Sequence, residues 1–133
     1  MPTEDVRHLS TTIATPFDRA YAFAHQPANF VTWAAGLART LHHTDHGWVA
    51  DTPEGEATVV FSEPNAFGIL DHRVRLAGKP EVYIPLRLIA HGDRTEVVLT
   101  LFRQPGMDDA MFERDAGLVT RDLAALKRVL ESR

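Results

Sequence analysis

The C-terminal part of the chain carries one continuous apolar stripe. Its members recur at alternating steps of four and three residues: Phe112, Ala116, Val119, Leu123, Leu126 and Leu130. This spacing places every member on one face of an α-helix. Asp108 is the expected N-cap of that helix, and Asp109 suits the positive end of the helix dipole. A helix of this kind needs a second apolar layer over its stripe, so the rest of the chain must supply one.

The preceding segment, 37–103, is patterned as strands. Turn signals divide it at Asp45-His46-Gly47, Pro53-Glu54-Gly55, Pro64-Asn65, Gly78-Lys79-Pro80 and Gly92-Asp93. The positions of these turns predict six strands joined by short connections, which is typical of an antiparallel meander.

A strand over Val6–Ala14 and two short helices come before the meander. Thr15 is the expected N-cap of the first helix, with Pro16 at its first position. Pro27 ends that helix, because the residue before a proline avoids the helical region. We expect the second helix over 27–35, closed by Gly36.

We therefore expect an α+β fold in which a curved seven-stranded antiparallel sheet wraps around the long C-terminal helix. The two short helices lie between the first and second strands. With 133 residues, the chain is expected to form one domain, 1–133, because that length suits a single core.

Composition excludes several classes of protein. The 14 Lys and Arg against 18 Asp and Glu give a net charge of −4, which argues against a nucleic-acid binder. The chain has no cysteine, so disulfides, thiolate metal sites and a cysteine nucleophile are excluded. No apolar run approaches the ~20 residues of a membrane span, and the polar start is unlike a signal peptide. We expect a cytoplasmic protein.

Turn lengths also predict which residues face each other across the strands. Tight loops place Leu86 opposite Leu99, His72 opposite Ile84, Trp48 opposite Val59, Ala50 opposite Ala57, Leu41 opposite Ala50 and His43 opposite Trp48. A four-residue loop over 63–66 places Leu70 opposite Val59 and His72 opposite Ala57. The cross-strand partners form rows of inward-facing side chains. In the row that contains Ala50 and Ala57 the side chains are small, so they leave unfilled volume on a concave sheet.

The sequence therefore predicts a cavity between the sheet and the C-terminal helix, with Trp33 at its mouth. The candidate lining residues are Trp33, His43, Trp48, Ala50, Ala57, Val59, Leu70, His72, Ile84, Leu86, Leu99, Leu101, Phe112 and Val119. Mostly apolar walls with few polar groups are typical of a small-molecule site.

His72 is the polar residue on this apolar face. One interpretation is a core histidine whose ring is satisfied by a neighbour or by water. The other is a ligand anchor or an acid/base group, since its ordinary pKa suits proton transfer near neutrality. Asp71 points to the opposite face and forms no dyad with it by adjacency alone.

Tyr83 and Arg87 are weaker catalytic candidates. In the predicted register both lie on the face opposite the apolar row. A bulge at Pro85 would turn Arg87 inward, where it could bind a carboxylate or phosphate. Of His42, His43 and His46, only His42 and His46 share a strand face. His46 lies in the predicted turn and no third ligand for zinc is evident, so we expect no metal. No glycine-rich phosphate loop is present, and we expect no cofactor.

Several segments resemble the START-like (Bet v 1-like, SRPBCC) superfamily, in particular bacterial polyketide cyclase/dehydrase-like proteins. The N-terminal ones are Ile13–Phe23 (IATPFDRAYAF) and Pro27–Ala34 (PANFVTWA). The C-terminal ones are Phe67–His72 (FGILDH), Tyr83–Arg87 (YIPLR), Leu99–Met107 (LTLFRQPGM) and Asp122–Lys127 (DLAALK). The resemblance covers nearly the whole chain.

The resemblance implies a helix-grip fold with a hydrophobic cavity for lipids, polyketides or other apolar small molecules. It does not imply one reaction, because the superfamily mixes enzymes, transporters and binders. Three hypotheses follow: a binding protein for a small hydrophobic or amphipathic molecule, a cyclase or dehydratase with His72 as acid/base beside Arg87 or Tyr83, and an interaction protein or homodimer with a vestigial cavity. Tyr83, Ile89, Val98 and Phe102 form the apolar outer patch of the third hypothesis.

Overall fold

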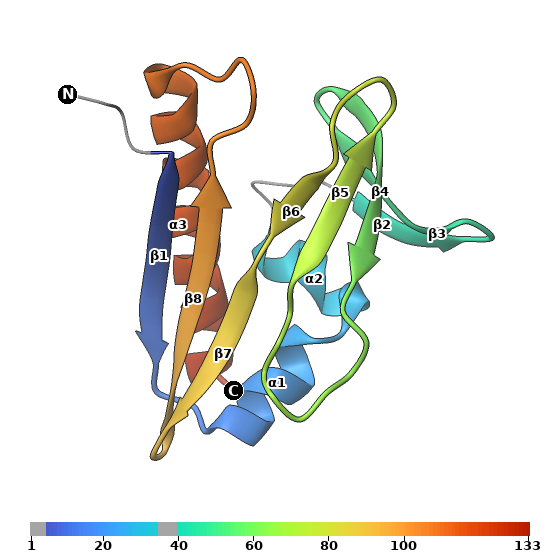
Figure 1. The fold of residues 1–133 in the computed structure, drawn as a ribbon. Helices are drawn as coiled ribbons and strands as arrows, with labels where there is room; N and C mark the ends of the chain where they lie inside the picture. Colours follow the sequence, from blue (N-terminus) through green and yellow to red (C-terminus); the bar gives the residue numbers. More distant parts are fainter. Residues whose placement is uncertain (1–4, 35–39) are drawn as a thin grey trace.

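The computed structural model describes residues 5–34 and 40–133. Its elements in chain order are β1 (Val6–Ile13), α1 (Phe17–Ala24), α2 (Pro27–Trp33), β2 (Thr40–Thr44), β3 (Gly47–Thr52), β4 (Gly55–Phe61), β5 (His72–Leu76), β6 (Val82–Ile84), β7 (Leu86–His91), β8 (Arg94–Phe102) and α3 (Asp109–Glu131). Within these ranges the strands form two antiparallel sheets, β1-β8-β7 and β2-β3-β4-β5-β6 (Figure 1). The predicted α+β class and the order of its elements are confirmed.

The expected seven-stranded sheet is divided at Pro85, so the described residues form eight strands in two sheets. A proline has no N–H, and it therefore interrupts a strand ladder. The segment predicted as one strand becomes β6 in the five-stranded sheet and β7 in the three-stranded sheet. The Thr100 amide donates to the Pro85 carbonyl at 3.0 Å, which holds the two sheets together at the break.

α1 begins directly after Pro16 and α2 begins at Pro27, but Thr15 does not cap α1. Pro16 occupies the N-cap position and makes no side-chain cap. Thr15 is buried instead, and its hydroxyl donates to the Leu130 carbonyl at 3.3 Å, which ties the start of α1 to the end of α3. α2 ends at Trp33. The predicted helix end at 35–36 and the predicted strand start at 37 lie outside the described residues.

The hairpins with short turns have the predicted register. β2 pairs with β3 through Leu41–Ala50 and His43–Trp48, and β3 pairs with β4 through Trp48–Val59 and Ala50–Ala57. The pairs His72–Ile84 and Leu86–Leu99 are also confirmed.

The predicted register between β4 and β5 is wrong. His72 lies opposite Phe61, not Ala57, and Val59 lies opposite Val74, not Leu70. The connection is a long loop over 62–71 rather than a four-residue turn. Asn65 organises it: its side-chain oxygen accepts from the Phe67 and Ile69 amides at 3.0 and 3.1 Å. The shift is an even number of residues, so His72 still faces inward.

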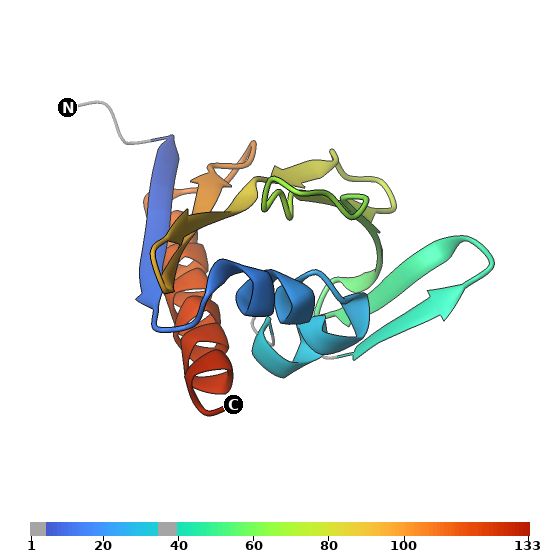
Figure 2. The same cartoon turned by 90° about the horizontal axis from the view of Figure 1, so that it is seen from below.

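α3 covers the three-stranded sheet, where it packs against β1 and β8 and also touches α2 (Figure 2). Its whole predicted stripe, from Phe112 to Leu130, is buried. Asp108 is the N-cap as predicted, and its carboxylate accepts from the Met111 amide at 2.8 Å. Among the described helices, none combines the length and the apolar character needed to cross a membrane.

Candidate functional site

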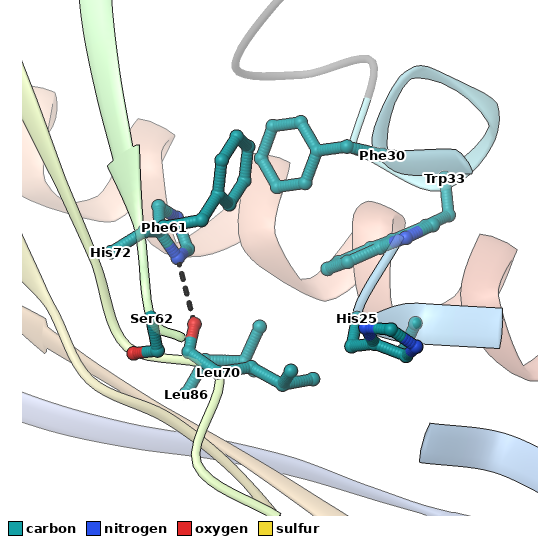
Figure 3. Close-up of a pocket in the computed structure, with 9 residues that line it drawn as sticks. His25, Phe30, Trp33, Phe61, Ser62, Leu70, His72 and Leu86 are labelled. Atoms are coloured by element: carbon teal, nitrogen blue, oxygen red, sulfur yellow. Dashed lines mark hydrogen bonds between the residues drawn. The ribbon is translucent and has the colours of Figure 1, made fainter. Parts of the chain in front are cut away.

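Two small cavities adjoin the rings of Phe30 and His72. One has a volume of about 20 Å³ and is lined by Ala24, His25, Phe30, Trp33, Phe61, Ser62, Leu70, His72 and Leu86 (Figure 3). The other has a volume of about 60 Å³ and is lined by Phe30, Ala50, Thr52, Ala57, Val59, His72 and Val74. Phe30 and His72 line both cavities, so the two cavities are neighbours.

The larger cavity lies between α2 and the inner face of β3, β4 and β5. The smaller one is lined by residues of α1, α2, β4, β5, β7 and the loop over 62–71. The predicted location between the sheet and the C-terminal helix is therefore wrong for both, since no α3 residue lines either one. The reason is the placement of α2, which contacts both α3 and β2. Its side chains Phe30 and Trp33 point inward, Phe30 towards Phe61 and Trp33 into the smaller cavity (Figure 3).

His72 is a buried histidine with one satisfied nitrogen. Its Nδ1 lies 3.1 Å from the Leu70 carbonyl oxygen. A carbonyl only accepts hydrogen bonds, so Nδ1 carries the ring hydrogen. Burial lowers the pKa of His72, against smaller opposing effects of this hydrogen bond and of the nearby Asp71 charge, so the neutral form of the ring is favoured. Its buried Nε2 has no hydrogen-bond partner among the described residues.

Trp33 contributes a second buried nitrogen. Its side chain lines the smaller cavity from α2, and its Nε1 likewise has no partner in the part of the chain that the structure describes. The Phe30 ring meets Trp33, Phe61 and His72 edge to face, with centroids 5.3, 5.4 and 5.5 Å apart. The site is thus an aromatic cluster with two polar atoms that lack partners.

Half of the predicted lining residues reach the cavities. Those that line at least one are Trp33, Ala50, Ala57, Val59, Leu70, His72 and Leu86. Those that line neither are His43, Trp48, Ile84, Leu99, Leu101, Phe112 and Val119. Trp48 packs instead against His43 and Phe61, with ring centroids 5.0 and 6.4 Å away.

The lining residues that sequence reasoning missed include Phe30, Phe61 and Val74. Phe61 follows Ala57 and Val59 at period two, so strand alternation alone places it on the inner face. Phe30 shares a helix face with Trp33, three residues away. His25 and Ser62 come from the ends of α1 and β4, where no periodic signal marks them.

Tyr83 and Arg87 are held away from His72 by Asp71. The Asp71 carboxylate accepts from the Tyr83 hydroxyl at 2.7 Å and from the Arg87 guanidinium at 2.9 and 2.8 Å. It also accepts from the Leu86 amide at 2.9 Å, just after the break at Pro85. Partial burial raises the pKa of Asp71, but these hydrogen bonds, led by the one from Arg87, outweigh it and hold that pKa at about 2. Neither Tyr83 nor Arg87 lines a cavity, so the three groups of the cyclase hypothesis do not converge.

The histidine group lies on the β2–β3 hairpin, which extends away from the two helices in Figure 2. His42 and His43 are exposed neighbours on β2, and their side chains alternate between its faces. Within residues 5–34 and 40–133, no three His, Asp or Glu side chains gather closely enough to hold a metal ion.

Comparison with known proteins finds similarity in structure only. No protein-family model and no curated protein matches the sequence. XoxI from Bacillus cereus is similar with a TM-score of 0.76 at 12% identity, over 96% of each chain. ZhuI aromatase/cyclase from Streptomyces sp. R1128 is similar with a TM-score of 0.68 at 17% identity, over 96% of this chain and 95% of that one.

A START superfamily protein from Mycobacterium smegmatis is also similar, with a TM-score of 0.67 at 12% identity over 96% of this chain and 97% of that one. At such low identity these likenesses show the fold alone. The chain has the helix-grip fold that the sequence resemblance implied.

Proposed function

We propose that this protein binds a small apolar molecule between α2 and the inner face of β3–β5. One observation carries the proposal: Phe30 and His72 line two neighbouring cavities, and Ala50, Ala57 and Val59 lie in the wall of the larger one. Predominantly apolar walls with a few polar groups are typical of ligand sites. Lipids, polyketides and simple aromatic molecules all belong to the class of ligand that such walls accept.

The ligand enters by displacing the Phe30 ring. The volumes of about 20 and 60 Å³ are each below the ~150 Å³ of a dry cavity that binds benzene. Phe30 lies on α2, a helix of seven residues without a side-chain cap. Its ring is held by edge-to-face contacts, each worth about 1 kcal/mol, so a ligand ring can replace them. Rotation of Phe30 joins the two cavities into one.

Titration with toluene, followed by two-dimensional NMR of the labelled protein, tests this function. The expected result is a set of saturable shifts at Ala57, Val59, Leu70 and Val74. Phe30→Leu shortens a side chain that lines both cavities, and we expect it to bind toluene severalfold more tightly than the wild type. Phe23→Leu is the matched control, because Phe23 is buried but lines neither cavity. The absence of saturable shifts in both wild type and Phe30→Leu would overturn the proposal.

Association of two copies is a second candidate, favoured by the outer face of the three-stranded sheet. Val6 and Phe102 lie directly opposite each other there and are 40% and 36% exposed, and Ile89 is 53% exposed. Tyr83 stacks on Phe102 with ring centroids 6.4 Å apart. Apolar residues that cluster at the surface, as Val6, Tyr83 and Phe102 do, mark protein interaction sites. Sedimentation velocity at rising concentration tests this candidate: a dimer that Phe102→Ser abolishes supports it, and a monomer at every concentration contradicts it.

A further inference from the structure

His72 presents one ring nitrogen that can only accept a hydrogen bond. Its Nδ1 hydrogen is bound to the Leu70 carbonyl oxygen, so the neutral ring keeps a lone pair on Nε2 and has no hydrogen there to donate. The residue is 2% exposed, and Nε2 is buried without a hydrogen-bond partner among the described residues. A hydrogen-bond donor is therefore the group that this nitrogen requires.

The polar side chains of the cavity walls do not supply this donor. The hydroxyls of Ser62 and Thr52 already donate to backbone carbonyl oxygens, at 2.6 and 2.7 Å. Trp33 and His25 lie on the opposite side of the smaller cavity from His72 (Figure 3). Among the residues that the structure describes, the donor that His72 lacks must therefore come from a molecule that enters the site.

The surroundings of the His72 ring make this requirement selective. Phe61 and Phe30 pack against the ring away from Leu70, with centroids 6.1 and 5.5 Å from its own (Figure 3). The same ring lines both cavities, so a molecule that occupies either of them lies against it. An acceptor held among apolar groups has no solvent to compensate for a missing partner, so an unpaired lone pair is costly there.

We propose that the ligand of this site is an apolar molecule that carries an O–H or N–H group, which donates a hydrogen bond to His72 Nε2. This inference rests on the proposed function, since the molecule must first enter beside Phe30. A ligand that covers Nε2 without a donor leaves a buried acceptor unpaired and loses affinity. Ketone, ether and ester oxygens only accept, so the site disfavours a molecule that has one of these as its sole polar group.

Pyrrole and furan are the probes that test the inference. They are five-membered aromatic rings of nearly the same shape, but pyrrole has an N–H donor where furan has an oxygen that only accepts. In a purely apolar cavity, loss of water from the pyrrole N–H makes furan bind about tenfold more tightly. We expect the wild type to bind pyrrole at least as tightly as furan. His72→Phe removes the acceptor and should restore the preference for furan to about tenfold.

His91→Phe is the control for the histidine change. His91 is exposed at the end of β7 and lines neither cavity, so its replacement should leave the ratio of the pyrrole and furan affinities unchanged. A ratio that is the same in the wild type and in His72→Phe overturns the donor inference, whatever its value. Binding of toluene without binding of pyrrole also overturns it, but leaves the proposed function intact. Failure of toluene, furan and pyrrole to bind both the wild type and Phe30→Leu overturns the proposed function and the inference with it.

A measurement on the wild type decides the matter even where His72→Phe does not fold. Nitrogen-15 NMR of the labelled histidine ring distinguishes a protonated from an unprotonated Nε2. At neutral pH we expect the Nδ1–H form of His72, with an Nε2 signal that pyrrole shifts and furan does not. A protonated Nε2, or equal responses to the two probes, overturns the inference.

Discussion

Asp71 and His72 are neighbours in the chain, but their side chains lie on opposite faces of the sheet. The Asp71 carboxylate binds Tyr83 and Arg87 on the outer side, whereas the His72 ring lines both cavities on the inner side. Strand alternation imposes this separation. Asp71 therefore holds the chain in place beside the break at Pro85, and His72 places a polar ring in the cavity walls.

Asp71→Asn is expected to destabilise the fold at neutral pH. The pKa of about 2 means that the ionised carboxylate is stabilised in the folded state. That stability is complete above the ordinary pKa of an unfolded aspartate, near 4, and is lost as the pH falls towards 2. We expect a loss of about 1–2 kcal/mol in the free energy of unfolding at pH 7, since the half-exposed Arg87 is screened by solvent.

Urea denaturation of wild type and variant at pH 7 and pH 2 measures this effect. The difference between them should shrink at pH 2, where the wild-type carboxyl is partly protonated. Glu81→Gln is the control, because Glu81 pairs with Arg73 and Arg75 on the exposed surface and its loss should change little. A variant as stable as the wild type at pH 7 contradicts the role assigned to Asp71.

His72 is expected to make the protein less stable in mild acid. Burial lowers the pKa of this ring in the folded state, so the unfolded chain binds a proton at a higher pH than the folded chain does. Stability is therefore complete above about pH 6.5 and falls below it, by up to about 1.4 kcal/mol per pH unit. Chemical denaturation between pH 7.5 and 5 should show this slope in the wild type.

The effect of His72 is isolated by the slope of the unfolding free energy against pH, not by the absolute stability of each variant. His72→Phe removes the group and should flatten the dependence of the unfolding free energy on pH. His91→Gln removes an exposed histidine and should leave the slope as in the wild type. Equal slopes for His72→Phe and the wild type would show that another group causes the acid sensitivity.

Local patterns were sufficient to predict much of this fold. The stripe of α3 and its Asp108 cap follow from helical spacing and backbone chemistry. The β2–β3 and β7–β8 registers follow from tight turns between alternating strands. Each of these features depends on residues close together in sequence.

The location of the cavities could not be predicted in the same way. It depends on how α2 docks, and helix docking joins residues far apart in the chain. The β4–β5 register also failed, because Asn65 holds the loop through its own side chain and through the Tyr21 hydroxyl, which accepts from the Asn65 amide at 2.9 Å. Inward-facing residues were still predicted there, since an even shift preserves the face.

Gly68→Ala is expected to disrupt the loop that leads to His72. Gly68 has a φ of +73°, and an added Cβ would collide with the Leu88 carbonyl oxygen and approach Phe17 to 2.8 Å. The Leu88 amide also donates to the Gly68 carbonyl at 2.8 Å, so the backbones of Gly68 and Leu88 are held close together. We expect a loss of about 3 kcal/mol or more in the free energy of unfolding.

Comparison with Gly78→Ala separates the steric collision at Gly68 from the cost of the left-handed backbone conformation. Gly78 has a similar φ of +76°, and no described atom lies within 4 Å of an added Cβ. Its substitution should therefore cost only about 1 kcal/mol, from the left-handed conformation alone. Thermal unfolding of both variants measures the difference. Equal losses of stability would show that the close approach of Gly68 to Leu88 and Phe17 adds no steric cost of its own.

Ala57→Val is expected to stabilise the protein while weakening ligand binding. Ala57 is fully buried at the wall of the larger cavity, which has a volume of about 60 Å³. Two added methyl groups fill part of that volume on a strand that favours β-branched residues. We expect a gain of about 1 kcal/mol in the free energy of unfolding and severalfold weaker toluene binding.

Ala20→Val is the contrasting substitution. Ala20 is equally buried but lines neither cavity, so its added methyl groups have no free volume to enter. Overpacking of this kind should cost about 1–3 kcal/mol. Denaturant unfolding and toluene titration of both variants provide the measurements. Destabilisation by Ala57→Val to the same extent as by Ala20→Val would mean that the space beside Ala57 is already filled in solution, and the proposed binding site would then lack its larger cavity.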